Sequence, residues 1–241
     1  MTASRRRFLR LIVAGSIAAI ALASPHLIAR IRRDRMAFEP VPGHPGYRRL
    51  AAGPMSGANP VLIGVETPID PAGATDLCAG LYGPSQAGTV PAAVFTDAFC
   101  PHCVPVDRML MARSGTTLAV QIHHLPRLGP ASVWAARAIL AAPDRADAFR
   151  ARFERSLAVI DKTRIVEIGG QLGLDPETFA DDLMSPKIDA ELARSEALAR
   201  SLGVVGTPTA VIGQTLIQGQ FSERVLEQII KEEARRPESF C

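Results

Sequence analysis

Two cysteines, Cys100 and Cys103, stand at C-x-x-C spacing around Pro101 and His102. Thiols at this spacing can close a small disulfide ring that exchanges with other thiols, or can supply half of a metal site. A protonated or hydrogen-bond-donating His102 would stabilise a neighbouring thiolate. The pair therefore indicates either redox chemistry or metal binding, and the surrounding chain has to decide between them.

The residues on either side of this pair predict a strand and a helix. Val90 to Thr96 is a short apolar run that suits a strand buried on both faces. We expect a helix to begin at Cys100, with Pro101 at its first position, and to run to about Arg113. A sulfur at a helix N-terminus faces unpaired N–H groups, which stabilise the thiolate. Cys100 is thus predicted to be the exposed, reactive sulfur, and Cys103 the resolving thiol.

The chain that follows completes a strand–helix–strand unit and then becomes helical. Leu118 to His124 alternates between two faces, which predicts a second strand and a right-handed parallel crossover. Helical patterns fill residues 131–202. Thr209–Ile212 and Leu216–Gln218 flank a Gly-containing turn and predict a hairpin, and Ser222 is the expected N-cap of a last helix. These elements predict an α/β fold.

This order of elements resembles the DsbA-like branch of the thioredoxin superfamily over roughly residues 90–235. Two motifs carry the resemblance, and they are Phe95-Thr96-Asp97 leading into Phe99-Cys100-Pro101-His102-Cys103, and Gly203-Val204-Val205-Gly206-Thr207-Pro208-Thr209. The resemblance implies a thioredoxin fold over residues 90–236 with an inserted helical subdomain at about 131–202. It also implies thiol–disulfide exchange at Cys100 and Cys103 without a cofactor.

The same resemblance assigns further roles. Thr207-Pro208 would be the cis-proline turn that faces the disulfide and offers backbone groups to a substrate strand, and Phe99 would also contact the substrate. Family members often carry a buried, proton-relaying acid six residues before the first cysteine, but that position here is Val94. Asp97 is three residues before Cys100 instead. One expected feature of the DsbA pattern is therefore missing from the strand.

The direction of electron flow stays open at this point. The C-P-H-C ring is similar to that of a dithiol oxidase acting on reduced exported proteins, with a membrane redox partner that resets the disulfide. The F-T-D lead-in and Thr207 before the proline are more similar to the isomerases DsbC and DsbG, although no dimerisation domain is evident in residues 36–89. An isomerase, a reductase serving for instance cytochrome c maturation, and a copper- or metal-binding module are the alternatives.

Residues 1–23 predict an export signal, because a basic stretch precedes the apolar run Leu11 to Ala23. Ser4 to Arg10 is similar to the twin-arginine export motif, and a general secretory signal or an uncleaved anchor reaching Ala29 are the alternatives. The predicted location is the periplasm, with anchoring to the inner membrane left open. Four arginines of this leader account for the formal charge of +3, so the near-neutral body gives no electrostatic case for nucleic acid.

The other two cysteines lie outside the predicted thioredoxin domain. Cys78 is in a Pro- and Gly-rich N-terminal extension of residues 24–89, and Cys241 ends a C-terminal tail of residues 237–241. An even cysteine count in an exported chain favours pairing, so a structural disulfide between them is predicted, with two free thiols as the alternative. His123 and His124 face opposite sides of a strand and make a poor chelate, and no resident metal is predicted.

Overall fold

The structure is a computed structural model that describes residues 36–57, 77–83, 86–153 and 160–236. The chain divides into two units, residues 1–38 and residues 39–241, and the elements below belong to the second. The predicted export signal and the predicted C-terminal tail lie outside the described residues. Among the residues that are described, no helix is long and apolar enough to cross a membrane.

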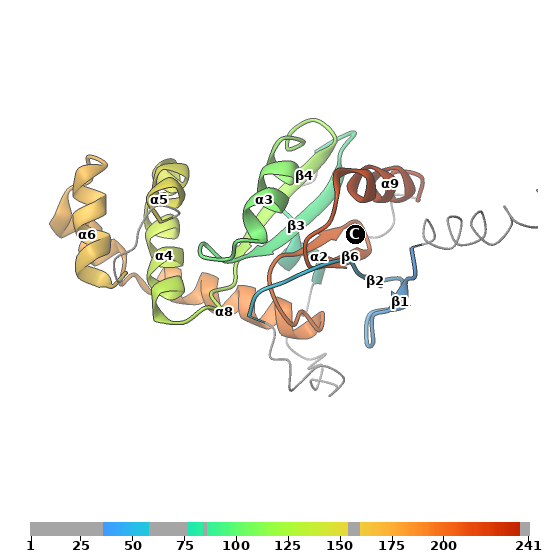
Figure 1. The fold of residues 1–241 in the computed structure, drawn as a ribbon, viewed down its shortest axis with the longest axis horizontal. Coiled ribbons are helices and arrows are strands. Elements are labelled where there is room, and N and C mark those ends of the chain that lie inside the picture. Colours follow the sequence, from blue (N-terminus) through green and yellow to red (C-terminus); the bar gives the residue numbers. More distant parts are fainter. Residues whose placement is uncertain (1–35, 58–76, 84–85, 154–159, 237–241) are drawn as a thin grey trace, which may run out of the picture. The chain divides into compact units, whose positions relative to one another are not determined.

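One mixed sheet organises the second unit, with strand order β1-β2-β6-β5-β3-β4 (Figure 1). The strands are β1 (Glu39–Pro40), β2 (Arg48–Ala51), β3 (Val90–Thr96), β4 (Leu118–His124), β5 (Thr209–Ile212) and β6 (Thr215–Gln218). The predicted parallel pair β3–β4 and the predicted hairpin β5–β6 are both confirmed, and β5 is antiparallel to β3. β2 joins β6 in parallel, so part of the N-terminal extension completes the central sheet.

Helices cover both faces of this sheet. They are α2 (Leu77–Leu81), α3 (Cys103–Met111), α4 (Pro130–Ala141), α5 (Ala146–Phe153), α6 (Lys162–Gln171), α7 (Pro176–Asp182), α8 (Pro186–Ser201) and α9 (Glu223–Glu233), with a 3-10 turn η3 (Pro143–Arg145). Phe95 of β3 packs in one core with Leu81 of α2 and Leu198 of α8. Its neighbour Thr96 points to the other face, where it hydrogen-bonds Asp107 of α3. α2 and α8 therefore cover one face, and α3 covers the opposite one.

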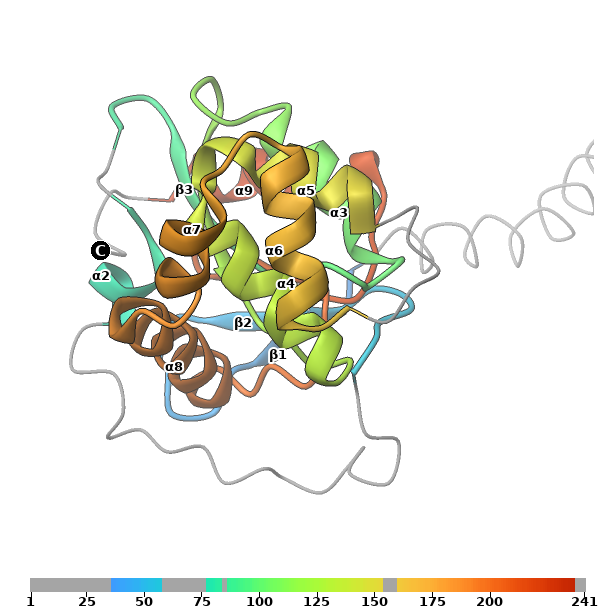
Figure 2. The same cartoon turned by 90° about the vertical axis from the view of Figure 1, so that its left-hand side faces the viewer.

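The predicted helical insertion of about residues 131–202 contains α4 to α8, of which α4 to α7 lie beside the sheet (Figures 1 and 2). The core of these helices combines aliphatic side chains with three phenylalanines, and the ring of Phe149 stacks on Phe153 and Phe179 with centroids 5.8 and 5.6 Å apart. Asp161 and Asp175 begin α6 and α7 by accepting a backbone N–H of the first turn. These caps explain where the helices of the insertion start, and the buried aromatic rings explain why they stay together.

A buried carboxylate fastens α9 to the sheet. Glu233 is fully buried and accepts the Thr215 hydroxyl at 2.6 Å and the Gln214 N–H at 3.0 Å. Arg48 of β2 reaches the same carboxylate at 3.2 Å. Gly213 has φ +53° and leaves room for it, since a Cβ there would overlap the carboxylate oxygen. Glu233 therefore ties β2, the β5–β6 hairpin and α9 together.

Replacing Glu233 by alanine is expected to lower the free energy of unfolding by about 3 kcal/mol, because the buried Thr215 hydroxyl and the part-buried Gln214 N–H and Arg48 guanidinium lose their acceptor. Urea unfolding measures this loss. Glu232→Ala is the matched control, since Glu232 binds the same Arg48 at 2.7 Å from a partly exposed position. That surface pair is expected to contribute less than about 1 kcal/mol. Equal losses in the two variants would contradict the role assigned to Glu233.

Candidate active site

The cysteine pair lies between the end of β3 and the start of α3. Cys100 and Cys103 form a disulfide, with their Cα atoms 5.3 Å apart. The prediction that the helix begins at Cys100 is wrong, because α3 begins at Cys103 after a turn in which the Cys103 N–H donates to the Cys100 carbonyl at 3.0 Å. Pro105 consequently falls in the first helical turn, where its missing N–H removes no intrahelical hydrogen bond. Cys100 thus precedes the helix, and Cys103 opens it.

The reactive sulfur is more enclosed than the sequence predicts. Cys100 is only 1% exposed, so the prediction of an exposed sulfur is wrong for the disulfide form. Its Sγ lies 3.3 Å from the carbonyl oxygen of Thr207. A disulfide-bonded sulfur carries no hydrogen, so this is a packing contact, and the Cys100 thiol could donate there only after reduction. Cys103 is equally buried, and access to either sulfur requires a local movement.

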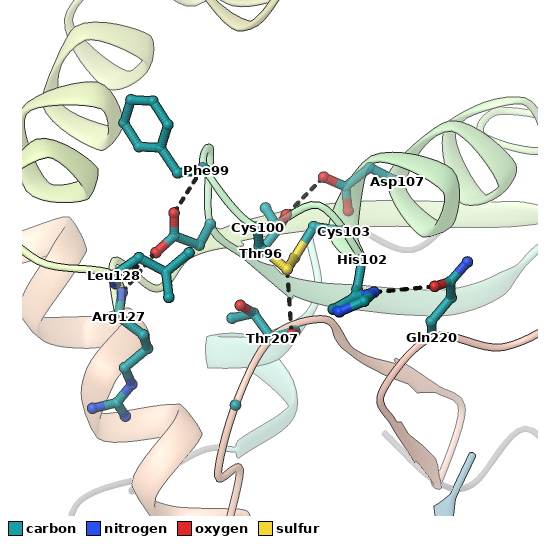
Figure 3. Close-up of a disulfide and its surroundings, with 12 residues drawn as sticks. Thr96, Phe99, Cys100, His102, Cys103, Asp107, Arg127, Leu128, Thr207 and Gln220 are labelled. Atoms are coloured by element: carbon teal, nitrogen blue, oxygen red, sulfur yellow. Dashed lines mark hydrogen bonds between the residues drawn. A yellow bond between two sulfur atoms is a disulfide. The ribbon is translucent and has the colours of Figure 1, made fainter. Parts of the chain in front are cut away.

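The loop before β5 faces the disulfide (Figure 3). The Thr207–Pro208 peptide is cis, as predicted. Both backbone groups of Thr207 are already paired: its N–H donates to the Ser56 carbonyl at 2.9 Å, and the Ser56 N–H donates to its carbonyl at 2.7 Å. The groups that the resemblance assigned to a substrate strand thus meet the chain's own Ser56. No local sequence signal marks this pairing, because it joins segments far apart in the chain.

The remaining residues predicted for this site lie in different directions. His102 donates from Nδ1 to Gln220 Oε1 at 3.3 Å, because an amide oxygen only accepts. Phe99 is half-buried and packs on Phe153 of the helical insertion, with ring centroids 5.7 Å apart. Pro101 is exposed in the turn between the cysteines. Figure 3 shows Phe99 and His102 on opposite sides of the disulfide.

Asp97 holds the loop that carries Cys100. This buried carboxylate accepts four hydrogen bonds. Its Oδ1 accepts the Phe99 N–H and the Ser132 hydroxyl, both at 2.9 Å. Its Oδ2 accepts the N–H groups of Arg127 at 2.7 Å and Leu128 at 3.2 Å. Asp97 therefore ties the loop entering α3 to the loop entering α4, and both of its oxygens are fully used.

A cavity of about 470 Å³ lies beside the resolving cysteine and is lined by Cys103, Asp107, Thr96 and His124, among others. Asp107 Oδ2 accepts the Thr96 hydroxyl at 2.7 Å, whereas Oδ1 has no hydrogen-bond partner among the described residues. Burial raises the pKa of Asp107 to about 6 and lowers the pKa of His124 to about 3. The sequence analysis missed Asp107, although its i,i+4 spacing from Cys103 places both on one helix face.

The other candidates lie apart from this site. Cys78 is on α2, with its Sγ 3.9 Å from the Tyr47 hydroxyl, but Cys241 lies outside the described residues, so their disulfide stays a prediction. His123 Nε2 donates to the Leu81 carbonyl at 2.9 Å inside the core. Within the described ranges, no group of three or more His, Cys, Asp or Glu residues could hold a metal ion.

One family model and several solved structures of thioredoxin-like proteins match this chain. A family model described as a DSBA-like thioredoxin domain matches residues 93–231. A thioredoxin-like oxidoreductase from Silicibacter pomeroyi DSS-3 is 29% identical, with a TM-score of 0.54 and coverage of 62% of this chain and 89% of that one. The thiol-disulfide exchange protein α-DsbA2 from Wolbachia pipientis is 26% identical, with a TM-score of 0.52 and coverage of 63% and 86%. A periplasmic thioredoxin-like protein from Salmonella enterica serovar Typhimurium is 27% identical, with a TM-score of 0.54 and coverage of 66% and 97%.

A curated relative of a different kind also matches. The Na(+)/H(+) antiporter NhaA of Herminiimonas arsenicoxydans is 28% identical over 176 residues, which are 71% of this chain and 27% of that protein. The chain therefore spans about a quarter of the length of this relative. The likeness concerns that part of the antiporter alone.

Replacing Asp97 by asparagine is expected to lower the free energy of unfolding by about 2 kcal/mol, because an amide NH₂ would then face N–H or hydroxyl donors. Thermal unfolding at neutral pH measures the change. Asp147→Asn is the control, since the Asp147 carboxylate is fully exposed and binds only Arg150 among the described residues. Asp97→Asn protein as stable as this control would show that the four hydrogen bonds do not hold the loop.

Proposed function

Since this chain belongs to the family of DSBA-like thioredoxin domains and carries a C-x-x-C disulfide, it is a thiol–disulfide oxidoreductase, and we propose that it acts as a dithiol oxidase on exported proteins. The observation that supports this most is the contact between Cys100 and the cis-proline loop, with 3.3 Å between Cys100 Sγ and the Thr207 oxygen. Of the two cysteines, Cys100 therefore has the sulfur that lies beside backbone groups with which a substrate peptide could pair.

The exchange proceeds in two steps. A substrate thiolate attacks Cys100 Sγ, a bond forms between these sulfurs, and the Cys100–Cys103 bond breaks with its electron pair on Cys103. A second substrate thiolate then attacks the substrate sulfur of this mixed disulfide, and Cys100 leaves as a thiolate. The substrate gains a disulfide, and the protein gains two thiols. The N-terminal end of α3 stabilises the departing thiolate, which makes the disulfide an oxidant.

Apolar side chains near the disulfide suit an unfolded substrate. Leu128 is 39% exposed and hydrogen-bonds Asp97 beside the Cys100 loop, and Val205 is 40% exposed two residues before Thr207. Exposed apolar groups at such a position favour segments whose cysteines are flanked by apolar residues. We therefore expect reduced, incompletely folded proteins as substrates, contacted by the Thr207–Pro208 loop.

The location and the partner complete the proposal. Residues 1–23 would direct export to the periplasm by a twin-arginine or a general secretory route, or would stay as an inner-membrane anchor reaching Ala29. The likeness to a periplasmic protein of Salmonella supports this location. A membrane redox partner would reset the disulfide after each turnover. A disulfide isomerase is the second candidate, favoured by Phe95-Thr96-Asp97 and by Thr207.

The oxidised protein is expected to remove two thiols from reduced, unfolded ribonuclease for each protein disulfide consumed, and to restore ribonuclease activity. Thiol titration and enzyme assay measure this. Incubated with disulfide-containing ribonuclease, Cys103→Ala protein should accumulate a mixed disulfide, because no resolving thiol remains. Cys100→Ala protein should accumulate none. Reactivation of scrambled ribonuclease without net loss of thiols would favour the isomerase instead.

A further inference from the structure

Asp107 is a part-buried acid with a buried carboxyl oxygen, and the exchange mechanism above does not use it. It lies one helical turn after Cys103, on the same face of α3, and both residues line the cavity of about 470 Å³. The Thr96 hydroxyl fixes Oδ2 at 2.7 Å, and Oδ1 has no hydrogen-bond partner among the described residues (Figure 3). A carboxyl oxygen that has no hydrogen-bond donor among the described residues thus lies on the same cavity as the resolving cysteine.

The chemistry at Cys103 needs a proton in that space. When the disulfide opens, the Cys103 sulfur leaves as an anion at a position that is 1% exposed. A buried thiolate costs free energy unless it is protonated or paired. In the opposite direction, the Cys103 thiol has to lose its proton before it can attack, because only the thiolate is nucleophilic.

We propose that Asp107 is the proton reservoir for Cys103. An acid on α3 would then take the proton-relay role for which β3 has Val94 in place of an acid. This inference rests on the proposed exchange function and deepens it. As the Cys100–Cys103 bond breaks, the Asp107 carboxylic acid gives its proton to the Cys103 sulfur, and the carboxylate regains a proton from solvent. In the reverse step, the Asp107 carboxylate takes the proton from the Cys103 thiol.

Other titratable groups line the same cavity, and they are Asp97, Arg108, His124, Asp147 and Arg150. Asp97 already accepts four hydrogen bonds, and Arg150 binds Asp147 at 3.1 Å. Burial keeps His124 neutral, since its pKa is lowered to about 3. Burial also outweighs the Thr96 hydrogen bond and the charge of Arg150 and raises the pKa of Asp107 to about 6, which suits proton transfer near neutral pH.

The pH profile for reduction of the Cys100–Cys103 disulfide by dithiothreitol tests this role. A small dithiol is used so that the outcome does not depend on the oxidase assignment. The rate constant per dithiothreitol thiolate should fall above about pH 6 as Asp107 loses its proton. Asp107→Asn should abolish this inflection and slow the reaction at least about tenfold at pH 5. Asp147→Asn, on the rim of the same cavity, should follow the wild type.

Two further variants keep the test decisive. Asp107→Glu retains a carboxyl and should retain an inflection. Thr96→Val removes a hydrogen bond that lowers the pKa of Asp107, so its inflection should move to higher pH. Near-ultraviolet circular dichroism verifies the fold of each variant. An Asp107→Asn profile that keeps the wild-type inflection would overturn the proposal. An equal loss of the inflection and of rate in Asp107→Asn and Asp107→Glu would also overturn it.

A second observation concerns residues 52–57, which continue β2 toward the cis-proline loop (Figure 1). Four backbone hydrogen bonds of 2.7 to 2.9 Å join this segment to Gln218, Gln220 and Thr207. Two of these four hydrogen bonds join Ser56 and Thr207 and form an antiparallel bridge. The segment therefore occupies the backbone groups that lie beside Cys100.

This segment is held by few contacts other than its backbone hydrogen bonds. None of its residues is buried, so few apolar contacts oppose its local opening. Gly53 approaches the Gln220 carbonyl, and Gly57 approaches the Arg127 side chain, so closely that a Cβ on either glycine would overlap them. Its attachment thus depends on backbone pairing and on the absence of side chains at two positions.

We infer that residues 52–57 are a built-in strand in the peptide position beside the disulfide, and that a protein substrate has to displace Ser56 from Thr207 to reach Cys100. Extended peptides bind by pairing with free backbone groups, and the Thr207 groups are taken. The carbonyl of Thr207 is 3.3 Å from Cys100 Sγ, so a peptide paired there would lie against the sulfur. This inference also rests on the proposed exchange function.

Gly57→Ala should release the segment, because Gly57 has φ +73° and no room for a Cβ. Mixed-disulfide formation with an unfolded cysteine peptide should become severalfold faster, and the Thr207 N–H should exchange hydrogen faster. Gly115→Ala is the matched control, with φ +75° and nothing within 4 Å, and should leave both rates unchanged. The inference would be overturned if Gly57→Ala accelerated hydrogen exchange at the Thr207 N–H but not mixed-disulfide formation with the peptide. It would also be overturned if Gly57→Ala did not accelerate exchange at the Thr207 N–H. Failure of the proposed function would instead abolish peptide reaction in all three proteins.

Discussion

The approach of Thr207 to Cys100 is the contact on which the site depends, and the pairing of β3 with β5 sets it. β3 ends just before the cysteine loop, and β5 begins just after Pro208. The two strands are antiparallel, with Phe95 opposite Thr209, so the loop after one strand meets the loop before the other. A slip of one residue would turn the side chains of β5 to the other face and move the loop away from the sulfur.

Two carboxylates near the disulfide differ in how fully they are hydrogen-bonded. Asp97 accepts four hydrogen bonds and is thereby committed to holding the loops before α3 and α4. Asp107 accepts one from Thr96 and keeps its other oxygen without a donor among the described residues. Four hydrogen bonds hold the Asp97 carboxylate in one position, whereas burial with a single hydrogen bond raises the pKa of Asp107. The first group fixes geometry, and the second is available for proton transfer.

The sheet extends beyond the thioredoxin core and approaches the loop that faces the disulfide. β2 pairs with β6, and the residues after β2 continue to Ser56, which meets Thr207. The same N-terminal extension that completes the sheet thus also reaches the reactive loop. Both sulfurs are buried and both backbone groups of Thr207 are paired, so the proposed access of a substrate to Cys100 involves opening of an exposed, weakly packed segment.

The sequence alone determined β3, β4 and the β5–β6 hairpin, because a short apolar run, a two-residue alternation and a Gly-containing turn are all local signals. It also determined Cys100, Cys103 and the cis peptide before Pro208, because fixed motifs mark them. Only the tertiary structure decided that α3 begins at Cys103, that Cys100 is buried, and that Ser56 and Asp107 belong to the site. Burial and pairing depend on which distant segments meet, and no local period or motif records that.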